Sequence, residues 1–372
     1  MPSTITEAED QLNSLLPISR MEHAPPTDLL AAAKAWSQVV WNEAVRLGAM
    51  PLSENELQKG LKFAQHPVFI CGVHRSGTTL VRNLLDSHPD LVVLPSEGTY
   101  YTNLEFKLKS LPESEQIAFL GMEWLRRLAN PINQPPYWLL GRSSETISPY
   151  IDFARYLMAW WTAGRKDDQE WPHIAILLAY ASVTGNIEAK FWVDKTPANE
   201  RFLNRIWAEM PNAKIIHVIR DPITTLTSRK KMEPSITMRT ALLDLKVSFK
   251  VAVEQSRLND PRFLLVRYEE LCDDPDVVIE RMTNFLEIPV LDILTQSTVA
   301  GMPTEANSSF GKEGKAGQIL KSSQHQQSEL LSNTEQELIA AYIGDLATQL
   351  KYPLTKVTTL RKLYLRLKNR LW

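Results

Sequence analysis

The sequence has few cysteines and no long apolar run, and each absence excludes a class of protein. Two cysteines, Cys71 and Cys272, occur among 372 residues, so a disulfide framework and a cysteine-rich zinc cluster are excluded. No stretch approaches the roughly 18 apolar residues of a membrane span. The first 20 residues contain acids where a signal peptide has a basic run, and no apolar segment follows. These features predict a soluble, cytoplasmic protein.

The sequence also lacks a strong net charge. It contains 41 Lys and Arg against 43 Asp and Glu, a net charge of −2, so no overall field attracts the protein to nucleic acid. The charge is unevenly placed, because residues 351–372 hold seven basic residues and no acid. The rest of the chain has 34 basic and 43 acidic residues, a net charge of −9.

The basic C-terminal tail, residues 351–372, has the pattern of an amphipathic helix. Apolar residues recur at helical spacing and basic residues surround them. Such a helix either makes a peripheral contact with an anionic membrane or packs its apolar stripe on its own domain. The predicted stripe consists of Leu360, Leu363, Tyr364, Leu367 and Leu371.

Short apolar runs alternate with helical segments from Pro67 onwards. The runs are "VFICGV", "LVVL", "KFWV", "KIIHVI" and "RFLLV", and uninterrupted runs of this kind suit strands buried on both faces. The alternation predicts an α/β fold with a parallel, doubly wound sheet. In such sheets ligands bind beyond the carboxyl ends of the strands.

Three consecutive segments are predicted along the chain, the second of which contains an insertion. Residues 1–60 form a helical extension, residues 61–350 form the main domain, and the basic tail follows. A helical insertion of the main domain, at about 98–187, contains five of the ten tryptophans. Their rings form the core of a helical subdomain, or some of them line a substrate pocket. These residues are Trp124, Trp138, Trp160, Trp161 and Trp171.

The stretch "FICGVHRSGTTL" nearly matches the phosphate-binding pattern G-x-x-x-x-G-K-[ST]. Gly72, Gly77 and Thr79 have the right spacing, but Thr78 stands at the lysine position. A glycine-rich turn between strand and helix directs N–H groups at an anion, although the stretch could simply be a tight turn. Because the missing lysine normally reaches the outer phosphates, a diphosphate-like group without a metal ion is expected. The candidate ligands are Arg75, Ser76, Gly77, Thr78 and Thr79.

A second candidate anion site follows the predicted strand 214–219. Arg220 would lie at the carboxyl end of this strand, and Pro222 is well placed to begin a helix. Ser228 comes two helical turns later, so both side chains can face one anion. The alternative is that Arg220 pairs with Asp221 or another acid. Two anion sites at neighbouring strand ends fit a nucleotide that is phosphorylated at both ends.

These motifs resemble those of sulfotransferases, which use 3′-phosphoadenosine 5′-phosphosulfate. "HRSGTTL" resembles their 5′-phosphosulfate loop, and the Arg220–Ser228 pattern resembles their 3′-phosphate site. The resemblance covers residues 67–289, extends weakly to about residue 320, and is nearest to bacterial and tyrosylprotein-type enzymes. It implies that Tyr268, in "RFLLVRYEELCDDP", lies near the adenine, although a packed core tyrosine is the alternative. In "SSFGKEGKAGQIL" it implies that Lys312 or Lys315 contacts the 3′-phosphate.

The same resemblance implies candidate catalytic residues. Glu97 comes 22 residues after Arg75, at a place similar to the glutamate taken as catalytic base in tyrosylprotein and related bacterial sulfotransferases. Lys195, in "DKTP", resembles a lysine that approaches the transferring group, and Arg75 would be the second cation. The alternatives are that Glu97 has a surface or helix-capping role and that Lys195 pairs with Asp194 or Glu200.

The expected activity is therefore sulfuryl transfer from 3′-phosphoadenosine 5′-phosphosulfate to a hydroxyl or amine. Tyrosylprotein enzymes carry a membrane anchor and disulfides, and this sequence predicts neither. We therefore expect a small-molecule, lipid or glycan acceptor rather than peptidyl tyrosine. Ser308 or Ser309 would donate a hydroxyl near the bridging oxygen. A nucleotide or small-molecule kinase and a non-catalytic nucleotide-binding protein at a membrane surface are the alternatives. Nothing in the sequence indicates an oligomeric state.

Overall fold

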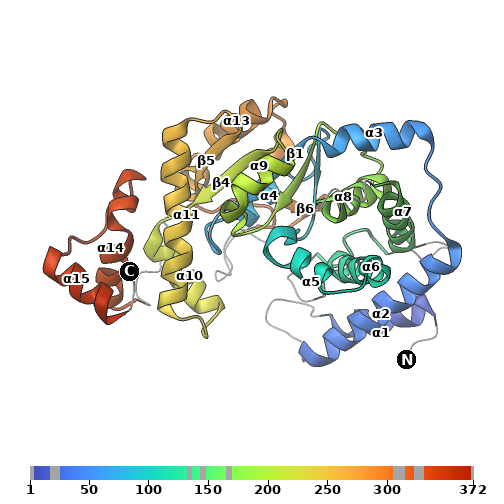
Figure 1. Ribbon diagram of the computed structural model, residues 1–372, viewed down its shortest axis with the longest axis horizontal. Coiled ribbons are helices and arrows are strands. Elements are labelled where there is room, and N and C mark those ends of the chain that lie inside the picture. The colour runs from blue at the N-terminus through green and yellow to red at the C-terminus, as the bar shows by residue number, and fades with distance from the viewer. Residues whose placement is uncertain are drawn as a thin grey trace. The chain divides into compact units, whose positions relative to one another are not determined.

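The computed structural model describes residues 4–16, 26–131, 136–142, 148–164, 170–304, 315–321 and 331–369 (Figure 1). Three of the predicted site residues, Ser308, Ser309 and Lys312, lie outside these ranges. The chain forms two compact units. No helix of the described ranges is both long and apolar enough to cross a membrane. Unit 1 comprises Met1–Pro67, Leu85–Asp194 and Thr298–Thr304, and unit 2 comprises Val68–Leu84, Lys195–Ser297 and Glu305–Trp372.

The five predicted strands all form, in a sheet of order β2-β3-β1-β4-β5. The pairs β2–β3, β1–β4 and β4–β5 are parallel, which confirms the predicted α/β fold with a parallel sheet. Every residue of β1, β2 and β3 is buried, as the uninterrupted apolar runs indicate. The strands are β1 (Pro67–Cys71), β2 (Leu91–Val93), β3 (Phe191–Lys195), β4 (Lys214–Ile219) and β5 (Phe263–Arg267).

Unit 2 holds the helices that follow β1, β4 and β5. Pro222 occupies the first turn of α10, as predicted, and Asp221 caps this helix with its side chain. Leu226 of α10 and Phe249 of α11 belong to one apolar core with Ile339 of α14. The helices are α4 (Thr78–Leu85), η2 (Asn199–Phe202), α9 (Leu203–Glu209), α10 (Pro222–Met232), α11 (Met238–Leu258), α12 (Tyr268–Asp273), α13 (Pro275–Leu286), η3 (Asp292–Thr295), α14 (Asn333–Gln349) and α15 (Thr359–Lys368).

Unit 1 is mainly helical, and its described residues between β2 and β3 include no strand. A short antiparallel hairpin, β6 (Thr298–Val299) and β7 (Met302–Pro303), also belongs to it. Tyr100–Leu104 form a π-helical turn, η1, directly before α5. The other helices are α1 (Ile5–Leu15), α2 (Pro26–Leu47), α3 (Glu54–Ala64), α5 (Glu105–Lys109), α6 (Glu113–Ala129), α7 (Pro149–Ala163) and α8 (Trp171–Val183).

An aromatic core joins the N-terminal helices to the insertion within unit 1. The Trp36 ring lies 5.3 Å from the Trp138 ring and 5.1 Å from the Tyr150 ring, both edge to face. Of the five tryptophans of the insertion, four are buried and Trp161 is partly buried. These four rings are therefore buried in a helical subdomain, which is the first of the two alternatives predicted for them.

Candidate active site

The loop after β1 has a backbone that needs glycine at two positions. Gly72 has φ +144° and Gly77 has φ +103°. A Cβ on Gly72 would overlap the Val218 carbonyl oxygen, and one on Gly77 would overlap the Tyr268 ring. Helix α4 begins at Thr78, so the loop ends at a helix N-terminus as the motif requires. Here the local structure follows the prediction.

The loop carries an unusual hydroxyl group. The Ser76 side chain is fully buried, and its Oγ has no hydrogen-bond partner among the described residues. Buried polar atoms rarely go without a partner, and those that do point to a bound ion, a water molecule or a functional role. Of the neighbouring threonines, Thr78 is buried and Thr79 is exposed. Ser76 Oγ is therefore available to accept or donate a further hydrogen bond.

The segment after β3 is hydrogen-bonded along the start of this loop. Thr196 N–H donates to Ile70 O at 3.1 Å, and Ala198 N–H donates to Gly72 O at 3.1 Å. These bonds hold Lys195, the buried last residue of β3, next to the end of β1. The backbone that follows Lys195 thus lies along the start of the phosphate loop. An approach of the Lys195 side chain to the transferring group stays a prediction.

Glu200 accepts a hydrogen bond from the loop after β1, a role that was not predicted from the sequence. Its Oε2 accepts a hydrogen bond from Gly72 N–H at 3.0 Å. Burial raises the pKa of the Glu200 carboxyl to about 7, although hydrogen bonds from backbone N–H groups oppose the shift. Ser248 Oγ accepts from Val73 N–H at 3.3 Å and lies 2.9 Å from His217 Nε2. Burial lowers the pKa of His217 to about 3, so its ring is neutral.

The two predicted anion sites meet in unit 2. Arg75 Nε donates to Ser228 Oγ at 3.0 Å, although 153 positions separate them in the sequence. Arg220 Nη1 lies 3.4 Å from the Arg75 carbonyl oxygen, in hydrogen-bonding geometry. The phosphate loop and the strand-end segment after β4 therefore form one group of cationic and hydroxyl side chains.

Arg220 is 8% exposed and has no carboxylate partner within the described part of the chain. Its predicted alternative partner, Asp221, instead accepts a hydrogen bond from Thr224 N–H at 2.7 Å. The Arg220 guanidinium lies 4.3 Å from the centre of the Tyr268 ring, a cation–π contact. A buried arginine without a counter-ion is a place for an anionic ligand.

Tyr268 is buried between the loop and Arg220. Its ring contacts Gly77 closely and lies under the Arg220 guanidinium. In this arrangement the ring packs against both anion-binding segments, which is the alternative to an adenine contact that the sequence left open. A contact between Tyr268 and the adenine stays a prediction.

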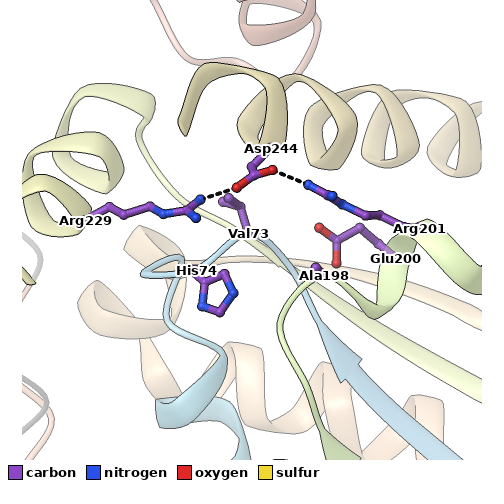
Figure 2. A pocket seen from close by; sticks show the side chains of 7 residues that line it. All are labelled: Val73, His74, Ala198, Glu200, Arg201, Arg229 and Asp244. Carbon is purple, nitrogen blue, oxygen red and sulfur yellow. Dashed lines mark hydrogen bonds and ion pairs between the residues drawn. The ribbon is translucent and has the colours of Figure 1, made fainter. Parts of the chain in front are cut away.

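A pocket of about 120 Å³ lies beside the loop. Figure 2 shows the loop and helix side chains that line it. Arg229 Nη1 donates to Asp244 Oδ2 at 2.6 Å, and Arg201 bonds the other oxygen of the same carboxylate. Both arginines of this pocket are thus engaged with Asp244, which ties α10 and η2 to α11. The lining residues are Val73, His74, Ala198, Glu200, Arg201, Arg229 and Asp244.

Lys315 is the one C-terminal loop lysine of the prediction that lies in the described residues. Its segment is attached through Ser297, whose N–H donates to Gly317 O at 3.0 Å. Ser297 Oγ in turn accepts from Asn83 Nδ2 of α4 at 3.2 Å. The structure therefore connects the exposed Lys315 to the helix that follows the phosphate loop.

Glu97 belongs to unit 1, where Arg127 of α6 holds its loop. The Arg127 guanidinium donates to the carbonyl oxygen of Glu97 and to Thr99 Oγ1, the latter at 3.0 Å. Gly98 N–H donates to the buried Asp194 Oδ1 at 2.9 Å, and a Cβ at this glycine would overlap that carboxylate. Thr99, rather than Glu97, occupies the N-cap position of η1. Glu97 itself is partly buried.

His173, a residue of the insertion, has a packing role. It is fully buried, with its ring 5.3 Å from Tyr100 and 5.5 Å from Trp192. Burial, together with the charge of Arg127, lowers the pKa of His173 to about 3. The neutral ring is held in an aromatic cluster of unit 1.

Comparisons with known proteins agree with these motifs. A family model described as "Sulfotransferase family" matches residues 67–292, more than half of the chain. The Protein-tyrosine sulfotransferase A of Caenorhabditis elegans is 26% identical over 229 residues, which cover 60% of this chain and 50% of that protein. An uncharacterized protein of Aquifex aeolicus (strain VF5) is 22% identical over 239 residues, covering 61% of this chain and 26% of that protein. The chain thus spans half or less of the length of these relatives.

Solved structures include similar sulfotransferases. The sulfotransferase domain of the Synechococcus PCC 7002 olefin synthase aligns with 81% of this chain and 94% of that domain, with 18% identity and a TM-score of 0.44. The family model spans the phosphate loop, the candidate base and the strand-end arginine described above. The chain belongs to the sulfotransferase family.

Proposed function

We propose that the chain transfers a sulfuryl group from 3′-phosphoadenosine 5′-phosphosulfate to an acceptor hydroxyl or amine. The observation that carries this proposal is the hydrogen bond between Arg75 and Ser228. It joins a loop suited to the 5′-phosphosulfate with a segment suited to the 3′-phosphate. The buried, carboxylate-free Arg220 and the unpartnered Ser76 hydroxyl suit the same doubly phosphorylated nucleotide.

In this reaction the acceptor oxygen or nitrogen attacks the sulfur, and the bond from sulfur to the 5′-phosphate oxygen breaks. Adenosine 3′,5′-bisphosphate leaves, and the acceptor proton passes to a general base, for which we propose Glu97. Arg75, Lys195 and the N–H groups at the start of α4 would stabilise the charge that develops on the leaving phosphate. The protein thus supplies orientation, positive charge and one proton acceptor.

The proposed acceptor is a small molecule, a lipid or a glycan. Because one relative is a Protein-tyrosine sulfotransferase, a tyrosine peptide must be included among the acceptors that are tested. Transfer to that peptide alone would replace the proposed acceptor class while leaving the proposed reaction in place.

Transfer of labelled sulfate to such a panel tests the reaction, with Glu97→Gln as the informative variant. If Glu97 is the base, turnover falls by about 10²–10⁴-fold while the affinity for adenosine 3′,5′-bisphosphate stays unchanged. Glu113→Gln, an exposed carboxylate on α6, is the matched control and should keep full turnover. Unchanged turnover in Glu97→Gln would remove this residue from the mechanism, and absence of any transfer would count against the proposed reaction.

A further inference from the structure

Helix α15 exposes a continuous apolar stripe. The exposed fractions are 83% for Leu360, 51% for Leu363, 51% for Tyr364 and 48% for Leu367. Their spacing of three, four and seven residues places them on one face of the helix. Single exposed apolar residues are ordinary, whereas four large ones within eight residues form a patch.

The opposite face of α15 docks on α14, so the helix is held in place without this stripe. Leu365 is 1% exposed and belongs to the core of unit 2. Arg361 Nη2 pairs with Glu337 Oε2 at 2.7 Å, and Arg366 Nε donates to Ala341 O at 2.8 Å. The two helices lie side by side in Figure 1. The helix therefore docks on its own domain, one of the sequence alternatives, but through Leu365 rather than through the four described residues of the predicted stripe. The fifth stripe residue, Leu371, lies outside the described residues.

Positive charge borders the stripe. Lys368 Nζ and the Arg361 guanidinium lie 5.9 Å and 5.5 Å from the centre of the Tyr364 ring. Lys351 and Lys356 are exposed in the segment that leads to the helix, and residues 351–372 contain no acid. Long basic side chains beside apolar ones suit a surface with anionic groups above a hydrocarbon layer.

This charge distribution favours a lipid surface over a second copy of the chain. Two copies that met through this stripe would bring the same cationic borders together, which repel one another. An anionic bilayer neutralises these borders, while its acyl region accepts the leucines.

We propose that α15 binds the surface of an anionic lipid bilayer, with Leu360, Leu363, Tyr364 and Leu367 inserted below the headgroups. The basic side chains beside the stripe, Lys368 foremost, contact the headgroups. The helix is already folded and docked, so binding requires no unfolding of unit 2. The proposal is independent of the sulfotransferase reaction and of any particular acceptor.

Co-sedimentation of the full chain with phosphatidylcholine vesicles, with and without phosphatidylglycerol, tests the proposal. We expect binding to the anionic vesicles that weakens as salt is added, and little binding to the neutral ones. Leu363→Ser combined with Leu367→Ser should weaken binding by about tenfold or more, because two apolar side chains leave the acyl region. Leu258→Ser, which changes a leucine of α11 that is 70% exposed, is the matched control and should bind like the wild type.

Three results would overturn the proposal. They are equal binding by the double variant and the wild type, binding that neither salt nor phosphatidylglycerol affects, and self-association of the wild type that the double variant loses. Because the substituted leucines are exposed, the double variant should fold, and its affinity for adenosine 3′,5′-bisphosphate checks this. An unchanged affinity with lost vesicle binding separates this proposal from the proposed catalytic function.

Discussion

Arg75 is the residue at which the two anion-binding segments of unit 2 meet. It has φ +73°, an unusual conformation for a residue other than glycine. Such a backbone costs on the order of 1–3 kcal/mol and persists where the surrounding contacts enforce it. Here Arg75 contacts Ser228 through its side chain and Arg220 through its carbonyl oxygen. The strained position thus coincides with the proposed donor site, where a fixed guanidinium is needed.

Glu200 makes the stability of the protein depend on pH in a defined window. Its pKa rises from an ordinary value of 4.5 to about 7 on folding, so the native state retains a proton that the unfolded chain loses. The contribution of Glu200 to the free energy of unfolding therefore falls as the pH rises from 4.5 to 7. At 1.36 kcal/mol for each pKa unit, the full change is about 3 kcal/mol.

Glu200→Gln removes this titration while its amide oxygen can still accept from Gly72 N–H. As the pH rises from 5 to 8, the free energy of unfolding of the variant should increase relative to that of the wild type, by up to about 3 kcal/mol. Urea unfolding followed by tryptophan fluorescence at both pH values measures this difference. As the pH falls, the buried His173 and His217 lower the free energy of unfolding. They do so equally in both proteins, so their effect cancels in the difference between variant and wild type. Identical pH dependence in variant and wild type would contradict the assignment.

At the scale of single elements, the segment Glu97–Thr99 is positioned by side chains from distant parts of unit 1. Arg127 of α6 binds oxygens of this segment, and Asp194 at the end of β3 binds the Gly98 N–H. The π-helical turn η1 begins directly afterwards, and such turns are frequent at functional sites. Arg127 and Asp194 therefore act as positioning residues for the candidate base.

Arg127→Ala should lower turnover by about tenfold or more, because the Glu97 carbonyl loses its hydrogen bond and the carboxylate loses its fixed position. Arg126→Ala is the matched control, because Arg126 also pairs with Glu123 but, within the described ranges, makes no hydrogen bond to Glu97–Thr99. A steady-state assay across pH measures both variants. Equal losses in the two would show that only helix α6 was disturbed.

The elements that were predicted correctly are those whose signal is local. Each strand is a short apolar run, and the loop after β1 combines a strand, two glycines and a helix start in one stretch. Arg127 gave no such signal, since its partners lie about 30 positions away in the sequence and it stands in a helix of ordinary composition. Glu200 was weighed only as a partner for Lys195, because its bond to Gly72 spans 128 positions.

At the scale of the whole molecule, the sequence pattern did not predict that the N-terminal helices pack on the insertion. Residues 1–60 and the insertion were predicted as two pieces, yet Trp36 packs on Trp138 and Tyr150, more than 100 positions away, within unit 1. Periodicity predicts that a helix has an apolar face but does not identify the surface that covers it. The proximity of Arg75, Arg220 and Ser228 in unit 2 follows from the sequence pattern, because the carboxyl ends of parallel strands meet at one edge of a sheet. Anion binding by these residues stays a prediction.

The central claim is that unit 2 binds a nucleotide carrying phosphate at both its 3′ and 5′ ends. Calorimetric binding of adenosine 3′,5′-bisphosphate, compared with ATP and Mg²⁺, tests it on the wild type, Arg220→Ala and the exposed control Arg257→Ala. We predict metal-independent binding of the bisphosphate, weakened about tenfold or more by Arg220→Ala and unchanged in the control, because a charged hydrogen bond to phosphate is lost. Preference for ATP with Mg²⁺, or equal bisphosphate affinity in wild type and Arg220→Ala, would contradict the claim.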